Sequence, residues 1–98
     1  MLPSASIGNE ISLYEPIHGS YPQASGKNIA NPMAMILSAG LMMDLSFGMK
    51  KESELINKAV KEALENGIVT EDINNSDNFS TSEVGDWIAK KVRELYLI

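Results

Sequence analysis

His18 is the only histidine in the chain, and it lies in a long polar stretch, residues 15–32. This stretch holds several residues that favour turns: Gly19, Pro22, Gly26 and Asn28. A loop of this length in a small domain is usually either functional or disordered. Pro16 at its start and Asn31-Pro32 at its end restrict the backbone, which favours order. We therefore interpret residues 18–31 as a ligand-binding loop.

The composition excludes several other kinds of site. The chain has 98 residues and no cysteine, so disulfides and thiolate metal sites are excluded, and one histidine cannot build an imidazole-rich metal site. Eight basic and 13 acidic residues give a net charge of −5, which argues against nucleic acid or an anionic membrane as a partner. Hydrophobic residues at 44% and charged residues at 21% are typical of one small globular domain.

Neither a targeting segment nor a membrane span is predicted. Residues 1–7 lack the basic segment and apolar run of a signal peptide. The most apolar window, residues 33–47, contains Ser38, Asp44 and Ser46 and is too short to cross a bilayer. The sequence therefore predicts a cytoplasmic protein with no membrane partner.

One short strand is expected within residues 9–17. Residues 1–9 are rich in serine, alanine and glycine and predict a loop. Ile11 and Leu13 then lead into Glu15-Pro16-Ile17, and Pro16 lacks the N–H of a ladder donor, which predicts an edge strand or its end. A single strand needs partners, so we expect the domain to be incomplete.

Three helices are expected after the loop. The first begins at Asn31-Pro32, is apolar on nearly every face through residue 47, and ends at Gly48. A helix of this kind needs neighbours on most sides. The second, residues 51–65, carries one apolar stripe and ends at Gly67.

The last helix is signalled by the capping pattern Ser80-x-x-Glu83. Its apolar stripe includes Trp87, which we interpret as a core anchor, and Gly85 weakens its first turn. Between the second and third helices, residues 68–70 suggest a short extended piece and residues 71–79 a surface loop.

Two blocks of the chain, Leu13-Tyr-Glu-Pro-Ile-His-Gly-Ser20 and Gly26-Lys-Asn-Ile-Ala-Asn-Pro32, closely resemble the C-terminal part of 3-isopropylmalate dehydrogenases. The resemblance extends over essentially all 98 residues. It implies an α/β fold in a parent enzyme several times longer. This segment would be mostly α, with three helices, one short strand and a long ligand loop. It would form the C-terminal part of the cofactor domain: a strand region at 9–17, an adenosine-binding loop at 18–31 and a helical part at 32–98.

The resemblance also implies an activity. Members of that family are homodimers that use NAD and Mg²⁺ or Mn²⁺ to oxidise and decarboxylate (2R,3S)-3-isopropylmalate in leucine biosynthesis. Their catalytic residues, metal ligands and substrate arginines belong to upstream chain. We therefore assign no catalytic or metal residue to this segment and expect it to be inactive alone.

The cofactor residues implied by the resemblance lie in the loop. His18 matches the residue that packs on the adenine ring, and Asn31 matches the one that hydrogen-bonds the adenine edge. Gly19 and Ser20 lie where the backbone approaches the sugar and phosphates, and Gly26 permits the return of the loop. Read without the motif, His18 is more often a surface histidine and Asn31 more often a helix cap.

One departure from the family concerns the choice of cofactor. Most relatives carry an aspartate that binds the adenosine ribose hydroxyls and repels a 2′-phosphate, whereas this chain has Gln23. An uncharged amide can bind the ribose but weakens discrimination against NADP. NAD is still favoured because no basic residue replaces the acid, and Lys27 is the nearest residue that could bind a 2′-phosphate.

Two alternatives stay open. The parent could be an isocitrate, homoisocitrate or tartrate dehydrogenase of the same superfamily, because substrate choice rests on upstream residues. The chain could instead be a non-catalytic helical module that binds an adenine nucleotide or a protein partner. In either case the apolar residues 33–47 predict self-association of the isolated chain.

Overall fold

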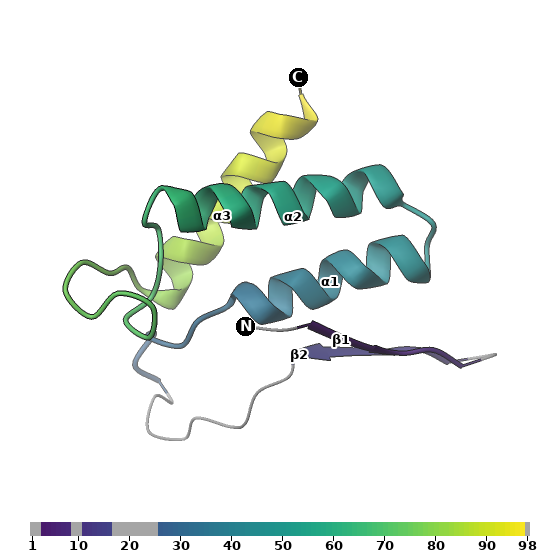
Figure 1. The fold of residues 1–98 in the computed structure, drawn as a ribbon, viewed down its shortest axis with the longest axis horizontal. Helices are drawn as coiled ribbons and strands as arrows, with labels where there is room; N and C mark the ends of the chain where they lie inside the picture. Colours follow the sequence, from purple (N-terminus) through teal and green to yellow (C-terminus); the bar gives the residue numbers. More distant parts are fainter. Residues whose placement is uncertain (1–2, 9–10, 17–25, 98) are drawn as a thin grey trace.

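The computed structural model of the chain describes residues 3–8, 11–16 and 26–97. Two short strands, β1 (Pro3–Ser6) and β2 (Leu13–Pro16), precede three helices, α1 (Met33–Leu45), α2 (Lys50–Glu65) and α3 (Thr81–Tyr96). In Figure 1 the strand pair runs along one side of α1, α2 lies along the other side, and α3 crosses α2. The expected three helices are confirmed, and the strand region at 9–17 contains β2.

The described residues contain two strands where the sequence predicted one. β1 lies within residues 1–9, which were expected to be a loop, and it pairs antiparallel with β2, with Ala5 opposite Tyr14 and Ser6 opposite Leu13. Its sequence, Pro-Ser-Ala-Ser, has no β-branched or aromatic residue, so local propensity gives no strand signal. Pairing with β2 and contact with α1 supply the stabilisation instead. β2 is described as far as Pro16, and the predicted end of the strand there borders residues 17–25, which lie outside the described residues.

Helix α1 is covered from two sides, as its apolar sequence requires. It contacts α2 on one side and both strands on the other. Gly40 is buried, and a Cβ there would lie 3.4 Å from Ile56 Cγ2 of α2, so the two helices approach closely. Met35 and Leu45 stay exposed on α1.

The core forms between the three helices and the segment that follows α2. Its fully buried apolar residues are Met33, Ala59, Val60, Ala63, Val69, Val84 and Ile88. Trp87 packs against this cluster, in agreement with its predicted role as an anchor, and Lys91 Nζ lies 5.5 Å from the centre of its ring. Residues 68–70 form no strand, and the Phe79 N–H donates to the Val69 carbonyl at 2.8 Å, which closes the intervening loop.

The first two helices end where their glycines predict. Gly48 and Gly67 adopt φ values of 63° and 72°, which L-residues with a side chain rarely take. The residue after each glycine then donates to a carbonyl of the last turn, Met49 to Met43 at 2.7 Å and Ile68 to Ala63 at 2.9 Å. None of the helices in the described part of the chain has the length and apolarity needed to span a bilayer.

Substitution of Gly8 should disrupt the turn between the strands. A Cβ at Gly8 would lie 2.4 Å from the Ile11 carbonyl oxygen, a backbone atom that cannot rotate away. We expect Gly8→Ala to lower the free energy of unfolding by about 1–3 kcal/mol, the usual range for overpacking. Urea unfolding and the loss of NOEs between Ala5 and Tyr14 would measure this effect.

Gly85→Ala is the matched control. A Cβ at Gly85, inside α3, has no heavy atom within 4 Å. The substitution should therefore raise stability by about 1 kcal/mol through helix propensity. The same direction of change in both variants would contradict the close contact at Gly8.

Candidate functional site

The structure describes only the second half of the predicted loop. Gly26, Lys27 and Asn31 are described, whereas His18, Gly19, Ser20 and Gln23 lie outside the described residues. Gly26 adopts a φ of 76°, which fits its predicted role in turning the chain, and Lys27 is exposed.

Asn31 connects the loop to the start of α1. Its Oδ1 accepts a hydrogen bond from the Met33 N–H, the first of α1, at 2.9 Å, although the N-cap is Pro32, one residue later than the sequence predicted. Its Nδ2 donates to Asp72 Oδ2 at 3.0 Å, and the other oxygen of Asp72 accepts from the Thr70 hydroxyl. The adenine contact of Asn31 stays a prediction. Asp72 was placed by the sequence only in a surface loop, and it now joins the site.

Asn28 attaches the loop to the N-terminus of α3. Its φ of 59° is left-handed, a conformation that asparagine tolerates better than most residues. Its carbonyl accepts from the Thr81 N–H at 2.9 Å. Its side chain accepts from the Ser82 N–H at 3.0 Å and donates to Ser82 Oγ at 2.8 Å. The Thr81 hydroxyl donates to the Ala30 carbonyl at 2.5 Å, so four hydrogen bonds join the loop to α3.

The sequence predicts Asn28 only as a turn former and does not reveal its partners. A signal was nevertheless present, because Ser80-x-x-Glu83 marks a helix N-terminus whose first N–H groups need acceptors. The sequence did not indicate that Asn28 pairs with Ser82, which lies 54 residues away.

The capping box predicted at Ser80 and Glu83 is confirmed. Ser80 Oγ accepts from the Glu83 N–H at 3.2 Å, and Glu83 Oε1 accepts from the Ser80 N–H at 3.0 Å. The backbone N–H of Ser80, and secondly its hydroxyl, hold the pKa of the exposed Glu83 carboxyl below its ordinary value. Together with Asn28, this arrangement gives acceptors to the N–H groups of Thr81, Ser82 and Glu83.

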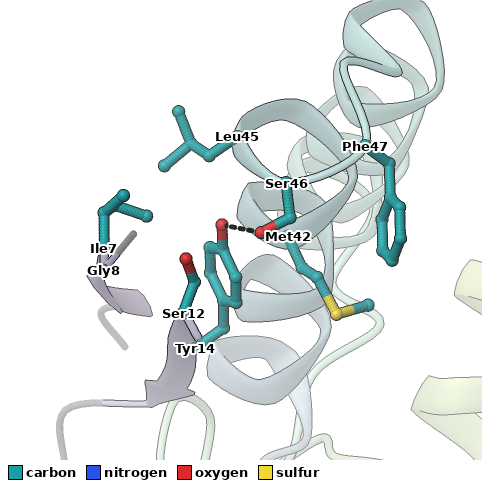
Figure 2. A pocket seen from close by; sticks show the side chains of 8 residues that line it. All are labelled: Ile7, Gly8, Ser12, Tyr14, Met42, Leu45, Ser46 and Phe47. Atoms are coloured by element: carbon teal, nitrogen blue, oxygen red, sulfur yellow. Dashed lines mark hydrogen bonds between the residues drawn. The ribbon is translucent and has the colours of Figure 1, made fainter. Parts of the chain in front are cut away.

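A second feature lies at the far end of α1, about 20 Å from Asn31 by helix length. It is an open hollow of about 460 Å³ between the turn of the strand pair and the C-terminal end of α1. Figure 2 shows Tyr14 facing Ser46 there, with the Tyr14 hydroxyl 2.6 Å from Ser46 Oγ. The lining residues are Ile7, Gly8, Ser12, Tyr14, Met42, Leu45, Ser46 and Phe47. Of the predicted cofactor residues that the structure describes, Gly26, Lys27 and Asn31, none lines the hollow.

Comparison with known proteins shows the family. The profile described as isocitrate/isopropylmalate dehydrogenase matches residues 1–88 of this chain. The chain belongs to the isocitrate/isopropylmalate dehydrogenase family. The resemblance seen in the two sequence blocks is thereby confirmed.

Named relatives of this family agree closely over a limited length. The 3-isopropylmalate dehydrogenases of Aquifex aeolicus and Thermotoga maritima are each 48% identical over 97 and 98 residues, which is 97% and 98% of this chain. The isocitrate dehydrogenase structure from Methylococcus capsulatus superposes with a TM-score of 0.88 at 35% identity, covering 93% of this chain. In all three cases the match is 27% of the relative, so this chain spans about a quarter of its relatives' length.

No metal site is contained in the part of the chain that the structure describes. Among these described residues, no three or more histidine, cysteine, aspartate or glutamate side chains come together in a group that could hold a metal ion. The Mg²⁺ or Mn²⁺ of the predicted parent enzyme was expected to bind outside this segment, and that expectation stays a prediction.

Removal of the Ser80 hydroxyl should separate the two causes of the Glu83 pKa shift. We expect Ser80→Ala to lower the free energy of unfolding by about 1 kcal/mol, because a helix cap is lost. The pKa of Glu83 should rise only part of the way, because the backbone N–H of residue 80 remains. Carboxyl carbon shifts followed against pH would measure it, with Ser76→Ala as an exposed control.

The sign of the pH dependence follows from the lowered pKa. The contribution of Glu83 to stability is complete above the pKa of the unfolded chain and is lost as the pH falls through the folded pKa. A full return of the Glu83 pKa to its ordinary value in Ser80→Ala would show that the hydroxyl is the main partner.

Proposed function

We propose that this chain is the cofactor-loop segment of an NAD-dependent 3-isopropylmalate dehydrogenase. The observation that carries the proposal is the 48% identity to enzymes of that name over nearly the whole chain. The attachment of residues 26–32 to α1, α3 and Asp72 supports it, because a binding loop needs a fixed backbone. The parent would be a cytoplasmic homodimer acting in leucine biosynthesis.

The described residues fit an adenosine group in their chemistry. Asn31 and Asp72 place an amide beside a carboxylate at the exposed start of α1. An amide can donate and accept, and a carboxylate can accept from an exocyclic amine, so the pair matches the mixed edge of adenine. We propose that His18 packs on the same ring, that Gly19 and Ser20 approach the sugar and phosphates, and that Gln23 binds the ribose.

The chemical step falls to the longer protein. NAD, when bound, would supply the hydride acceptor for oxidation of the substrate hydroxyl. The residues of this segment bind and orient the adenosine end of the cofactor, and they supply no proton transfer. We therefore propose that the 98-residue chain alone has no turnover.

A second candidate function is supported by one observation. The superposition on isocitrate dehydrogenase at a TM-score of 0.88 shows that the fold does not separate the two substrates. The higher sequence identity, 48% against 35%, favours 3-isopropylmalate.

One experiment tests the proposed activity. The matching segment of the Aquifex aeolicus enzyme can be replaced by this chain, since the two align over 97 residues. We expect the hybrid to reduce NAD with 3-isopropylmalate at a rate within about tenfold of the parent, because the catalytic residues are unchanged. A folded hybrid dimer that has lost NAD binding would contradict the proposal.

Choice of cofactor can be tested on the chain itself. In an amide NMR titration, ADP-ribose should shift the signals of residues 18–31, and its 2′-phosphorylated counterpart should bind at least about tenfold more weakly. The expected physical reason is that no basic group replaces the family's aspartate at Gln23. Equal binding of both ligands, abolished by Lys27→Gln, would instead assign the segment to an NADP enzyme.

We also propose that the apolar surface around the hollow is covered by the remainder of the longer protein. Five apolar residues at the start of β2, between the two strands and at or just after the end of α1 are each more than half exposed: Ile7, Ile11, Leu13, Leu45 and Phe47. In the isolated chain this surface should drive self-association. This surface differs from the predicted one, residues 33–47, in two ways. Helix α2 covers one side of α1, and the exposed apolar surface continues onto the strands.

Phe47→Asp tests this surface. Phe47 is 62% exposed, and loss of its burial between two copies should weaken self-association about tenfold in sedimentation equilibrium. Ile73→Asp is the matched control, because Ile73 is 47% exposed but lies in the loop after α2. A monomeric wild-type chain, or equal effects of both substitutions, would contradict the assignment.

A further inference from the structure

We infer that Asn28 is a positioning residue, one that holds the proposed adenosine loop in its binding conformation by hydrogen-bonding to the N-terminus of α3. The inference rests on the proposed function and deepens it. Nothing in the loop's own sequence requires this contact, because the partners of Asn28 are Thr81 and Ser82, more than 50 residues away.

Helix α3 needs the hydrogen-bond acceptors that Asn28 supplies. The first N–H groups of a helix have no partner within the helix. The capping box supplies an acceptor for Glu83 but not for Thr81 or Ser82. The Asn28 carbonyl and Oδ1 accept from those two groups at 2.9 and 3.0 Å. The contact therefore satisfies backbone donors that would otherwise need water.

The contact between Asn28 and α3 fixes the loop as well as the helix. Asn28 Nδ2 returns a hydrogen bond to Ser82 Oγ at 2.8 Å, and two residues on, Ala30 accepts from the Thr81 hydroxyl at 2.5 Å. Asn31, the predicted adenine residue, follows directly. The position of Asn31 is thus set from three directions: α1 through Met33, Asp72, and α3 through Asn28.

The conformation of the loop affects its affinity for a ligand. A ligand that binds one loop conformation has an apparent Kd equal to the intrinsic Kd divided by the fraction of chains in that conformation. Two hydrogen bonds to the Asn28 side chain bias that fraction, and their combined loss corresponds to a change of about tenfold. Asn28 touches no nucleotide atom in this account and acts only through Asn31.

Asn28→Gly is the decisive variant. Glycine adopts the φ of 59° without strain, so the backbone conformation is kept and only the two side-chain hydrogen bonds are removed. Titration of the 98-residue chain with ADP-ribose should show a Kd about tenfold higher than wild type. The amide of Ser82 should exchange faster with solvent, because its acceptor is gone.

Two further variants distinguish positioning from general stability. Ser82→Ala removes the Oγ acceptor of Asn28 Nδ2, together with the 3.3 Å contact between the Ser82 and Ser80 hydroxyls, and should raise the Kd less than Asn28→Gly. The double variant should bind no more weakly than Asn28→Gly alone, because the two substitutions remove the same contact. Asn28→Asp keeps the Oδ1 acceptor next to the helix N-terminus and should restore part of the affinity. Asn75→Gly, an exposed asparagine outside the contact, should bind like wild type.

The outcomes separate this inference from the proposed function. If Asn28→Gly binds ADP-ribose with the same Kd as the wild-type chain, the inference is overturned and the proposed function stays intact. Additive effects in the double variant would overturn it as well. A folded wild-type chain that does not bind ADP-ribose at all would overturn both the adenosine role of the loop and the role of Asn28.

Discussion

The structure depends on the need to cover helix α1. A helix that is apolar on nearly every face must be buried by neighbouring elements. Helix α2 packs on one side of α1 and the strand pair on the other. Because Gly40 has no side chain, the backbone of α1 packs directly against the Ile56 side chain of α2. At its N-terminal end the same helix is anchored by Asn31, the residue that also belongs to the candidate site. The helix that organises the core therefore also places the end of the loop.

Features encoded within a few residues were predictable from the sequence. The glycines at 48 and 67 and the capping box at Ser80 and Glu83 appear where expected. Each rests on a local steric or hydrogen-bonding rule. Strand β1 was missed because its stabilisation is not local: Ala5 and Ser6 become strand only by pairing with Tyr14 and Leu13. The residues of β1 carry no β propensity of their own.

The same distinction holds in the candidate site. The hydrogen bond from the Met33 N–H to Asn31 spans two positions, and the sequence placed a helix-starting asparagine there, one residue before the observed N-cap Pro32. The contact between Asn31 and Asp72 spans 41 residues, and that between Asn28 and Ser82 spans 54, so neither could be derived from spacing. The family resemblance named the residues expected to touch the cofactor. It did not name those that hold the loop in place, and these emerge only from the three-dimensional arrangement.

The arrangement at α3 also restricts how a dinucleotide could bind here. Helix N-termini commonly bind phosphate through free N–H groups. In α3 the N–H groups of Thr81, Ser82 and Glu83 already have acceptors in Asn28 and Ser80. A phosphate at that position would have to displace Asn28 and release the loop. Under the proposed function, the pyrophosphate contacts therefore fall to the loop backbone near Gly19 and Ser20 and to the remainder of the enzyme, while α3 contributes by holding the loop.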